Sequence, residues 1–175
     1  MKLFCEKLTK PDLFGVRLCG EGIVDFLQGC EYVFEAEKQI FQDPYMKAAG
    51  GRNRFGQKGR LRGKFDFSEF DWSGENRKPI AFEDMILYQC HLRGFTKHNS
   101  SGVKAPGTFS GFCEKLDYLE KLGINTVIFL PLYDFNERME KQNGKINYWG
   151  YSGDACYFAP KASYAVNYEK ARISF

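Results

Sequence analysis

The pattern of hydrophobic positions divides the chain into two parts of different character. From Phe14 to about Phe41, short apolar runs alternate with polar residues, and glycines recur at positions 15, 20, 22 and 29. This spacing predicts short strands joined by tight turns, and we include Ile23 and Val24 among the strand residues. Asp43-Pro44-Tyr45 then ends the pattern, because proline removes a backbone donor and restrains the residue before it. Residues 1–51 are therefore expected to form a small β-sandwich, or part of one.

The second half, residues 85–175, carries longer apolar periods. Met85–Phe95 is an apolar strand candidate, and a loop rich in serine, glycine and proline follows it. Thr108 is placed to cap a helix that repeats leucine and phenylalanine at spacings of three and four and stops at Gly123. Ile124–Leu130 then forms a continuous apolar run that ends at Pro131, which is typical of a strand buried on both faces of a parallel sheet. Strand, helix and strand predict a βαβ unit and hence an α/β sheet or barrel.

A basic, glycine-rich strip separates the two halves. Its cations are Arg52, Arg54, Lys58, Arg60, Arg62 and Lys64, and Gly56, Gly59 and Gly63 interrupt them. We interpret residues 52–84 as a linker or junction whose charges are solvated. A contact with nucleic acid is the alternative, but such segments usually interleave repeats with aromatics, and this strip offers only Phe55 and Phe65.

Composition narrows the function classes. The 175 residues are 43% hydrophobic and 27% charged with a net charge of +3, the balance of an ordinary globular protein with no general attraction to nucleic acid or membranes. Met1–Lys10 has no apolar run long enough for a signal peptide or spanning helix, so a cytoplasmic location is expected unless a further segment precedes it. The aromatic fraction is high at 17%, and exposed planar rings are suited to stacking on sugars or nucleobases.

The cysteines do not predict a metal site. Six cysteines form no C-x-x-C pair and only two histidines accompany them, so neither zinc nor any other cofactor is expected. Cys90, Cys113 and Cys156 lie among apolar neighbours, and we interpret them as reduced core residues.

Candidate chemistry falls in the loops that follow the two predicted parallel strands. In α/β barrels such loops build the active site, and the second of them, from Leu132 to about Tyr157, is unusually long. Its centre, Asn147-Tyr148-Trp149-Gly150-Tyr151-Ser152, suits a sugar-stacking platform, and we expect its rings both to pack the loop and to face a substrate. Acidic residues in and beside this loop are expected to be solvated rather than catalytic; they are Asp134, Glu137, Glu140 and Asp154.

Several ordered motifs resemble glycoside hydrolase family 13, in its isoamylase, pullulanase and glycogen-debranching branch. They cover Tyr32 to about Tyr168 and include Asp43-Pro44-Tyr45, Phe70-Asp71-Trp72, Tyr88-Gln89-Cys90-His91-Leu92-Arg93-Gly94-Phe95-Thr96, Gly123 to Pro131, Asn147 to Ser152, and Phe158-Ala159-Pro160-Lys161 followed by Ser163-Tyr164-Ala165. The resemblance implies a carbohydrate-binding-type sandwich followed by the first βαβ part of a (β/α)8 barrel, with residues 85–175 as the barrel portion. Gln89-Cys90 departs from the glutamate and methionine that this branch often has, which leaves the subfamily open.

The resemblance also implies an activity and a substrate. The family hydrolyses α-glucosidic bonds with retention through a carboxylate nucleophile and an acid–base carboxyl group, which lie on later barrel strands. This chain is therefore expected to lack the catalytic residues and to be inactive alone. Tyr151 matches the aromatic that stacks on the glucose next to the scissile bond, and Trp149, Tyr148 and His91 are further substrate-binding candidates, although His91 has a structural role as its more ordinary explanation.

Besides the nucleic-acid contact of the basic strip, two hypotheses about the function of the protein are open. The first is part of a hydrolase that acts on α-1,6 bonds of glycogen or starch, with an α-glucan as its substrate and no nucleic acid or membrane partner. The second is a non-catalytic glucan-binding protein, which requires that two parallel strands and one helix be stable with their apolar faces uncovered.

Overall fold

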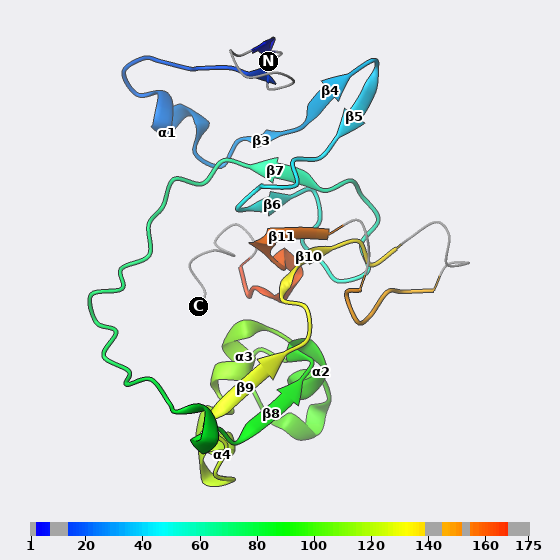
Figure 1. Cartoon of the computed structure of the whole chain (residues 1–175). Coiled ribbons are helices and arrows are strands. Elements are labelled where there is room, and N and C mark those ends of the chain that lie inside the picture. The colour runs from blue at the N-terminus through cyan, green and yellow to red at the C-terminus, as the bar shows by residue number, and fades with distance from the viewer. Residues whose placement is uncertain (1–2, 8–13, 139–144, 152–154, 168–175) are drawn as a thin grey trace.

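The computed structural model describes residues 3–7, 14–138, 145–151 and 155–167. Small antiparallel sheets occupy the N-terminal end of the molecule, and a helical unit with two parallel strands occupies the other end (Figure 1). The N-terminal elements are β1 (Glu6–Lys7), β2 (Phe14–Gly15), α1 (Ile23–Leu27), β3 (Glu31–Tyr32), β4 (Phe34–Ala36), β5 (Gln39–Phe41), β6 (Ala49–Gly50) and β7 (Arg62–Lys64). The others are β8 (Leu87–Cys90), α2 (Leu92–Lys97), α3 (Phe109–Cys113), α4 (Leu116–Lys121), β9 (Thr126–Phe129), β10 (Tyr133–Phe135) and β11 (Ala155–Pro160), with short 3₁₀ turns at Phe82–Asp84, Asn99–Ser101 and Ala162–Tyr164.

Short antiparallel strands in the N-terminal part confirm the alternating pattern. β4 and β5 form a hairpin whose two turn residues, Glu37 and Lys38, both have positive φ, at 48° and 64°. This is the left-handed backbone that a two-residue hairpin turn requires. The strand ends before Asp43, whose carboxylate accepts hydrogen bonds from the Tyr45 N–H at 2.8 Å and the Tyr32 hydroxyl at 2.6 Å.

One detail of the N-terminal prediction is wrong. Ile23 and Val24 lie in helix α1, which follows the left-handed Gly22 (φ 71°), and not in a strand. The described strands also do not pack as two facing sheets, because both faces of β4 and β5 are exposed. A sandwich with its own buried interior is therefore not formed by these strands alone.

The basic strip is not a simple solvated linker. Its last part, Arg62–Lys64, is strand β7, the central strand of the sheet β3–β7–β6. Its first residue, Arg52, is 4% exposed. The sheet therefore continues past residue 51, whereas the side chains of Arg54, Lys58, Arg60 and Arg62 are exposed as expected.

The predicted βαβ unit is confirmed. β8 and β9 pair in parallel, with Leu87 opposite Thr126 and Cys90 opposite Phe129, and the helices α2, α3 and α4 lie between them in the chain. Thr108 caps α3 by accepting a hydrogen bond from the Gly111 N–H at 3.1 Å. Gly123 adopts the left-handed conformation (φ 81°) just after α4, as its position in the sequence predicted.

Three boundaries in this unit differ from the prediction. β8 ends at Cys90 and residues from Leu92 onward form α2, because the side chain of His91 caps the new helix. The single helix expected after Thr108 is divided into α3 and α4. β9 is only partly buried, since β8 is its one strand neighbour in the described part of the chain and Ile128 is exposed.

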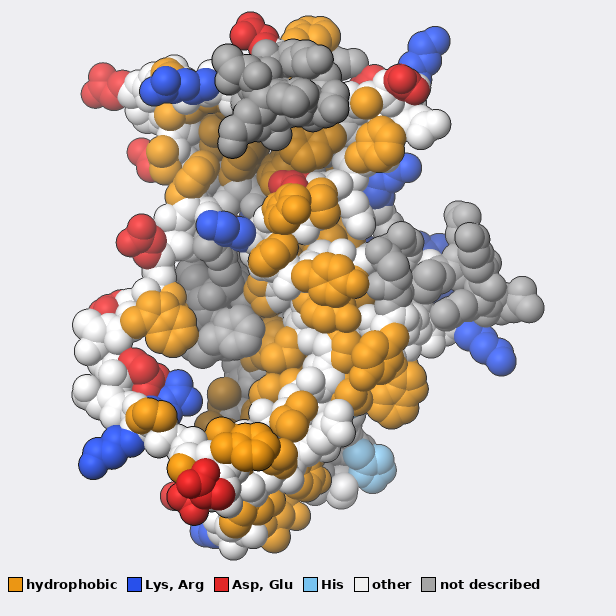
Figure 2. Space-filling model, in the orientation of Figure 1, with side chains coloured by type: hydrophobic (Ala, Val, Ile, Leu, Met, Phe, Trp, Pro, Cys, Tyr) orange, Lys and Arg blue, Asp and Glu red, His pale blue; other side chains and the backbone are white. Residues whose placement is uncertain are grey.

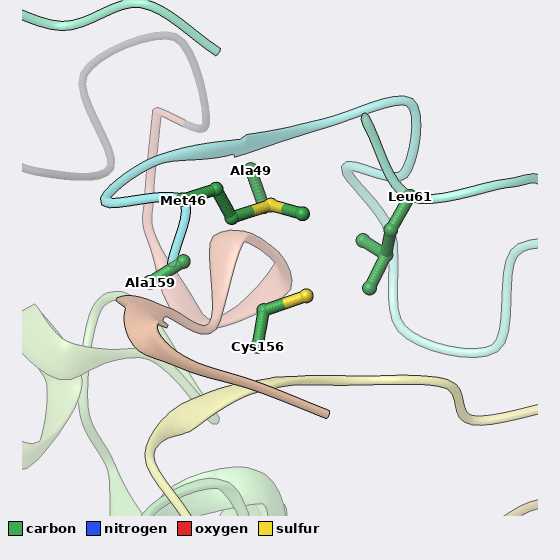
Figure 3. Close-up of a cluster of buried hydrophobic side chains, with 5 residues drawn as sticks. All are labelled: Met46, Ala49, Leu61, Cys156 and Ala159. Atoms are coloured by element: carbon green, nitrogen blue, oxygen red, sulfur yellow. The ribbon is translucent and has the colours of Figure 1, made fainter. Parts of the chain in front are cut away.

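Two hydrophobic cores hold these elements together. The first joins the N-terminal sheet to β11 and consists of Met46, Ala49, Leu61, Cys156 and Ala159, which converge from segments far apart in the sequence (Figure 3). The second lies under the parallel strands and consists of Leu92, Phe109, Phe112, Leu119 and Tyr164. Of the cysteines predicted to be buried, Cys156 is in the first core and Cys90 is half-buried, but Cys113 is exposed, so that prediction was wrong for Cys113. Burial raises the pKa of both Cys90 and Cys156 to about 11.

Candidate functional site

The candidate site is the aromatic loop, which we define as residues 145–151. Gly150 fixes its place in the fold, because a methyl group added there would lie 2.6 Å from the ring of Phe135 and 2.9 Å from Pro131. Gly150 also has a left-handed backbone, with φ of 81°. Since Pro131 follows β9 closely, the loop lies against the carboxyl end of that parallel strand, which is where α/β folds place their sites.

Asn147 forms the polar base of the loop and is buried. Its N–H donates to the Glu137 carbonyl at 2.7 Å, and its side-chain Nδ2 lies 3.4 Å from the Asn136 carbonyl. Its Oδ1 accepts from the Gly150 N–H at 3.2 Å. These bonds close the loop on itself and attach it to the segment that follows β10.

Tyr148 packs on His91, and their ring centroids lie 4.4 Å apart at an interplanar angle of 18°. The Nε2 of His91 donates to the Tyr148 carbonyl at 2.9 Å, while its Nδ1 accepts from the Gly94 N–H at 2.9 Å. A carbonyl only accepts and an amide N–H only donates, so these partners select the neutral Nε2–H tautomer. Burial lowers the pKa of His91 below its ordinary value, opposed by the bond to Tyr148.

The tip of the loop is exposed. Trp149 is 56% exposed and Tyr151 is 65% exposed, although Trp149 also meets the ring of His91 edge-on at 5.8 Å. Exposed hydrophobic side chains continue along one face of the molecule, from the N-terminal sheets to the parallel strands (Figure 2). The tip is therefore the part of the loop whose rings are free to meet a flat, partly apolar ligand.

Four buried charges lie beneath the loop. Lys161 contacts Asp134 at 3.1 Å and Glu137 at 2.7 Å, and Arg52 contacts Glu137 at 3.3 Å and Asp134 at 3.9 Å. All four side chains are at most 3% exposed, and with both carboxylates ionised the charges cancel. We call these residues the ion cluster.

The ion cluster is held by further hydrogen bonds. Lys161 Nζ donates to the Phe135 carbonyl at 2.7 Å and lies 4.0 Å from the centre of the Phe135 ring. Burial raises the pKa of Asp134, whereas Lys161, the Ala162 N–H and Arg52 act in the opposite direction. The Nε of Arg52 is buried and has no hydrogen-bond acceptor among the described residues. Polar groups so enclosed stabilise a fold only when nearly all their partners are present.

The structure brings together some of the predicted site residues and separates others. His91, Tyr148 and Trp149 form one contact group, in which Tyr148 and Trp149 meet edge-on at 5.4 Å. Tyr151 lies beyond them at the exposed tip. Both ring nitrogens of His91 have protein partners, which favours the structural role for it.

The acidic residues need a correction. Asp134 and Glu137 were expected on a solvated face, but both are 1% exposed within the ion cluster. Sequence reasoning missed this because their cations, Arg52 and Lys161, are distant in the chain, and no local pattern indicates which carboxylates they pair with. Glu140 and Asp154, like Ser152 of the aromatic motif, lie outside the described residues.

The described ranges contain no candidate metal site and no candidate membrane span. Within the described ranges, no group of three or more histidine, cysteine or acidic side chains could hold a metal ion. In the same ranges, no helix has both the length and the apolar character that crossing a membrane requires.

Comparison with known proteins gives a consistent set of relatives. The chain is 37% identical over 173 residues to chloroplastic isoamylase 1 of Oryza sativa subsp. japonica, a match that covers 93% of this chain and 21% of the relative. It is 36% identical over 93 residues to the glycogen debranching enzyme of Yersinia enterocolitica, covering 51% of this chain and 14% of that enzyme. Among solved structures, the pullulanase from Bacillus acidopullulyticus is similar with a TM-score of 0.64 and 28% identity, over 85% of this chain and 20% of the pullulanase. No family model matches the chain. The matches thus span between 14% and 21% of the length of these relatives.

Proposed function

The chain is homologous over most of its length to the isoamylases, glycogen debranching enzymes and pullulanases of glycoside hydrolase family 13, and on this premise we propose that it serves an α-glucan debranching hydrolase. Its part in that enzyme is to contact the glucan through the exposed rings Tyr151 and Trp149. The observation that carries the proposal is the aromatic loop itself. Its base is buried and hydrogen-bonded against the end of a parallel strand, while two rings are left exposed at its tip.

We also propose that β8, the intervening helices and β9 are the first βαβ part of a (β/α)8 barrel. The parallel pairing and the position of the loop at the strand ends support this. Leu87 of β8, Ile86 just before it and Ile128 of β9 are exposed, as is expected of strands that further barrel elements cover. In the same way, the exposed Phe34, Ile40 and Phe41 of the β4–β5 hairpin suit a larger carbohydrate-binding-type sandwich.

The division of chemical labour follows from the charges. Retaining glycosidases need two carboxyl groups that reach the substrate. Asp134 and Glu137 are buried and each is paired with two cations, so they are structural and not a catalytic pair. We therefore propose that this chain alone binds glucan but hydrolyses none, and that it acts on α-1,6 bonds only together with residues of the later strands. A cytoplasmic location stays a prediction, since the rice relative is named chloroplastic.

Fluorescence of Trp149 tests the binding proposal directly. The sequence has two tryptophans, so Trp72→Phe leaves Trp149 as the one indole reporter. Titration with maltotetraose is expected to shift or quench its emission with saturation, because a sugar ring over the indole removes water from it. Cellotetraose, with β-linked glucose, is the matched control and is expected to give a much weaker response.

Two results would overturn the proposal. One is an emission that maltotetraose leaves unchanged, and the other is an equal response to the two tetrasaccharides. Release of reducing ends from a branched glucan by the 175-residue chain would contradict its proposed inactivity.

A further inference from the structure

We propose that Arg52–Gly56, the first part of the basic strip, is a positioning segment for the aromatic loop. Arg52 and Phe55 are its two positioning residues. The segment follows β6 and leads towards β7, so the N-terminal sheet holds it on both sides in the chain. This segment belongs to the same site as the proposed function. Its role depends on that function only for the measurement of glucan binding.

Arg52 provides a polar connection to the loop. Its Nη1 donates to Asn136 Oδ1 at 2.8 Å and contacts Glu137 Oε2 at 3.3 Å. The backbone carbonyls of these same two residues accept the hydrogen bonds of Asn147. The guanidinium of Arg52 therefore contacts both residues that hold the base of the loop by hydrogen bonds. These two residues lie 84 and 85 positions after Arg52 in the sequence.

Phe55 provides an aromatic connection. Its ring meets Tyr148 edge-on at 5.8 Å and stacks on Tyr164 at 6.2 Å, and the guanidinium of Arg93 lies 4.4 Å from its centre. Tyr148 in turn contacts His91 and Trp149. The side chain of Phe55 thus supports the ring that precedes the exposed tip.

The two connections explain why one part of the strip is buried and the next is not. Arg52 is buried and Phe55 is half-buried, whereas Arg54 between them is exposed. Next to them, the Gly56 carbonyl accepts a hydrogen bond from Nε of Arg138 at 2.5 Å, which ties the segment to the chain beyond β10. The N-terminal sheet consequently contributes to the geometry of the candidate glucan site without touching the ligand.

The first test needs no ligand. In the Trp72→Phe chain, the steady-state anisotropy of Trp149 and its quenching by acrylamide report how firmly the loop is held. Phe55→Leu and Arg52→Met are expected to lower the anisotropy and to increase quenching, while Arg54→Ala, the exposed control, leaves both unchanged. Circular dichroism and cooperative unfolding establish that each variant is folded. If Arg52→Met does not fold, Arg52→Lys and Phe55→Leu show whether the segment positions the loop.

The second test measures affinity for maltotetraose by the same emission. Phe55→Leu is expected to bind about three- to tenfold more weakly, the effect of losing the edge-on pair with Tyr148 that supports the tip, whereas Phe55→Tyr restores most of the affinity. Folded Phe55→Leu and Arg52 variants whose anisotropy, quenching and affinity all equal those of Arg54→Ala would overturn the inference. If the parent chain does not bind maltotetraose, the proposed function fails, but the anisotropy and quenching data still decide the role of the segment.

Discussion

The base and the tip of the aromatic loop differ, although the same six-residue motif supplies both. Tyr148 is stacked on His91 and supported by Phe55, and Asn147 and Gly150 are buried. Trp149 and Tyr151, one residue away on either side of Gly150, are mostly exposed. The contacts of the base explain its residues as structural, whereas the exposed rings have few such contacts. This difference is our reason for proposing that the tip binds glucan.

A comparison of the two parts also shows what each depends on. The base is held by residues from three distant segments, namely Arg52 before β7, Asp134 to Glu137 at β10, and Lys161 after β11. The tip depends only on the base. Substitutions beneath the loop are therefore expected to change stability, and substitutions at the tip are expected to change binding.

Lys161→Met is expected to have the largest effect on stability. It leaves Asp134 and Glu137 buried with Arg52 as the one remaining cation of the cluster, and breaking a buried ion pair in this way costs about 3–5 kcal/mol. Urea unfolding followed by circular dichroism measures the change. Lys145→Met, at an exposed position of the same loop, serves as the control and is expected to stay within about 0.5 kcal/mol of the parent.

Gly150→Ala is expected to lower the free energy of unfolding by about 2–3 kcal/mol, since it combines a left-handed backbone with overpacking against Phe135 and Pro131. Gly102→Ala separates the two causes. Gly102 also has positive φ, at 65°, but a methyl group there would meet no atom within 4 Å. Equal losses for the two variants would show that the loop does not press on Phe135.

The lowered pKa of His91 leads us to expect a smaller, pH-dependent change in the free energy of unfolding. Because burial lowers its pKa in the folded protein, the unfolded chain binds more protons, and stability rises with pH in that range. The contribution of neutral His91 is thus complete above its ordinary pKa of 6.5 and is lost as the pH falls towards the folded value. Unfolding free energies measured at several pH values should show this loss in the parent and in His98→Gln, but not in His91→Phe.

Tyr151→Ala is expected to have the smallest effect on stability. The side chain is 65% exposed, so the free energy of unfolding should change by no more than about 0.5 kcal/mol. A loss of several kcal/mol in thermal or urea unfolding would show that Tyr151 belongs to the packed base of the loop.

Local signals in the sequence predicted the parallel unit well. Each signal is local. Thr108 indicates a helix cap, Gly123 a left-handed helix stop, and the continuous apolar run up to Leu130 a strand. The end of β8 was missed because His91 acts as a helix cap through its ring nitrogen, which is not among the usual cap residues. Helix α1 was missed because its five residues are too few to show the helical period that distinguishes a helix from a strand.

The sequence indicated the rings of the candidate site but not the buried charges beneath them. Clustered rings beside a glycine are visible in the sequence, and they led to Tyr148, Trp149 and Tyr151. The ion cluster was not visible, because Arg52 looks like any other residue of a basic strip until the fold places it beside Glu137. Charge alone predicts a solvated side chain, and only tertiary contacts overturn that expectation.

Our main proposal for this molecule, glucan binding at the tip of the aromatic loop, can be tested by isothermal titration of maltotetraose into the folded 175-residue chain and its Tyr151→Ala variant. We expect saturable heat with the parent chain and a loss of most of that binding in the variant, with unfolding curves that nearly coincide. Binding of equal strength by parent and variant, or no binding by a cooperatively folded parent, would contradict it.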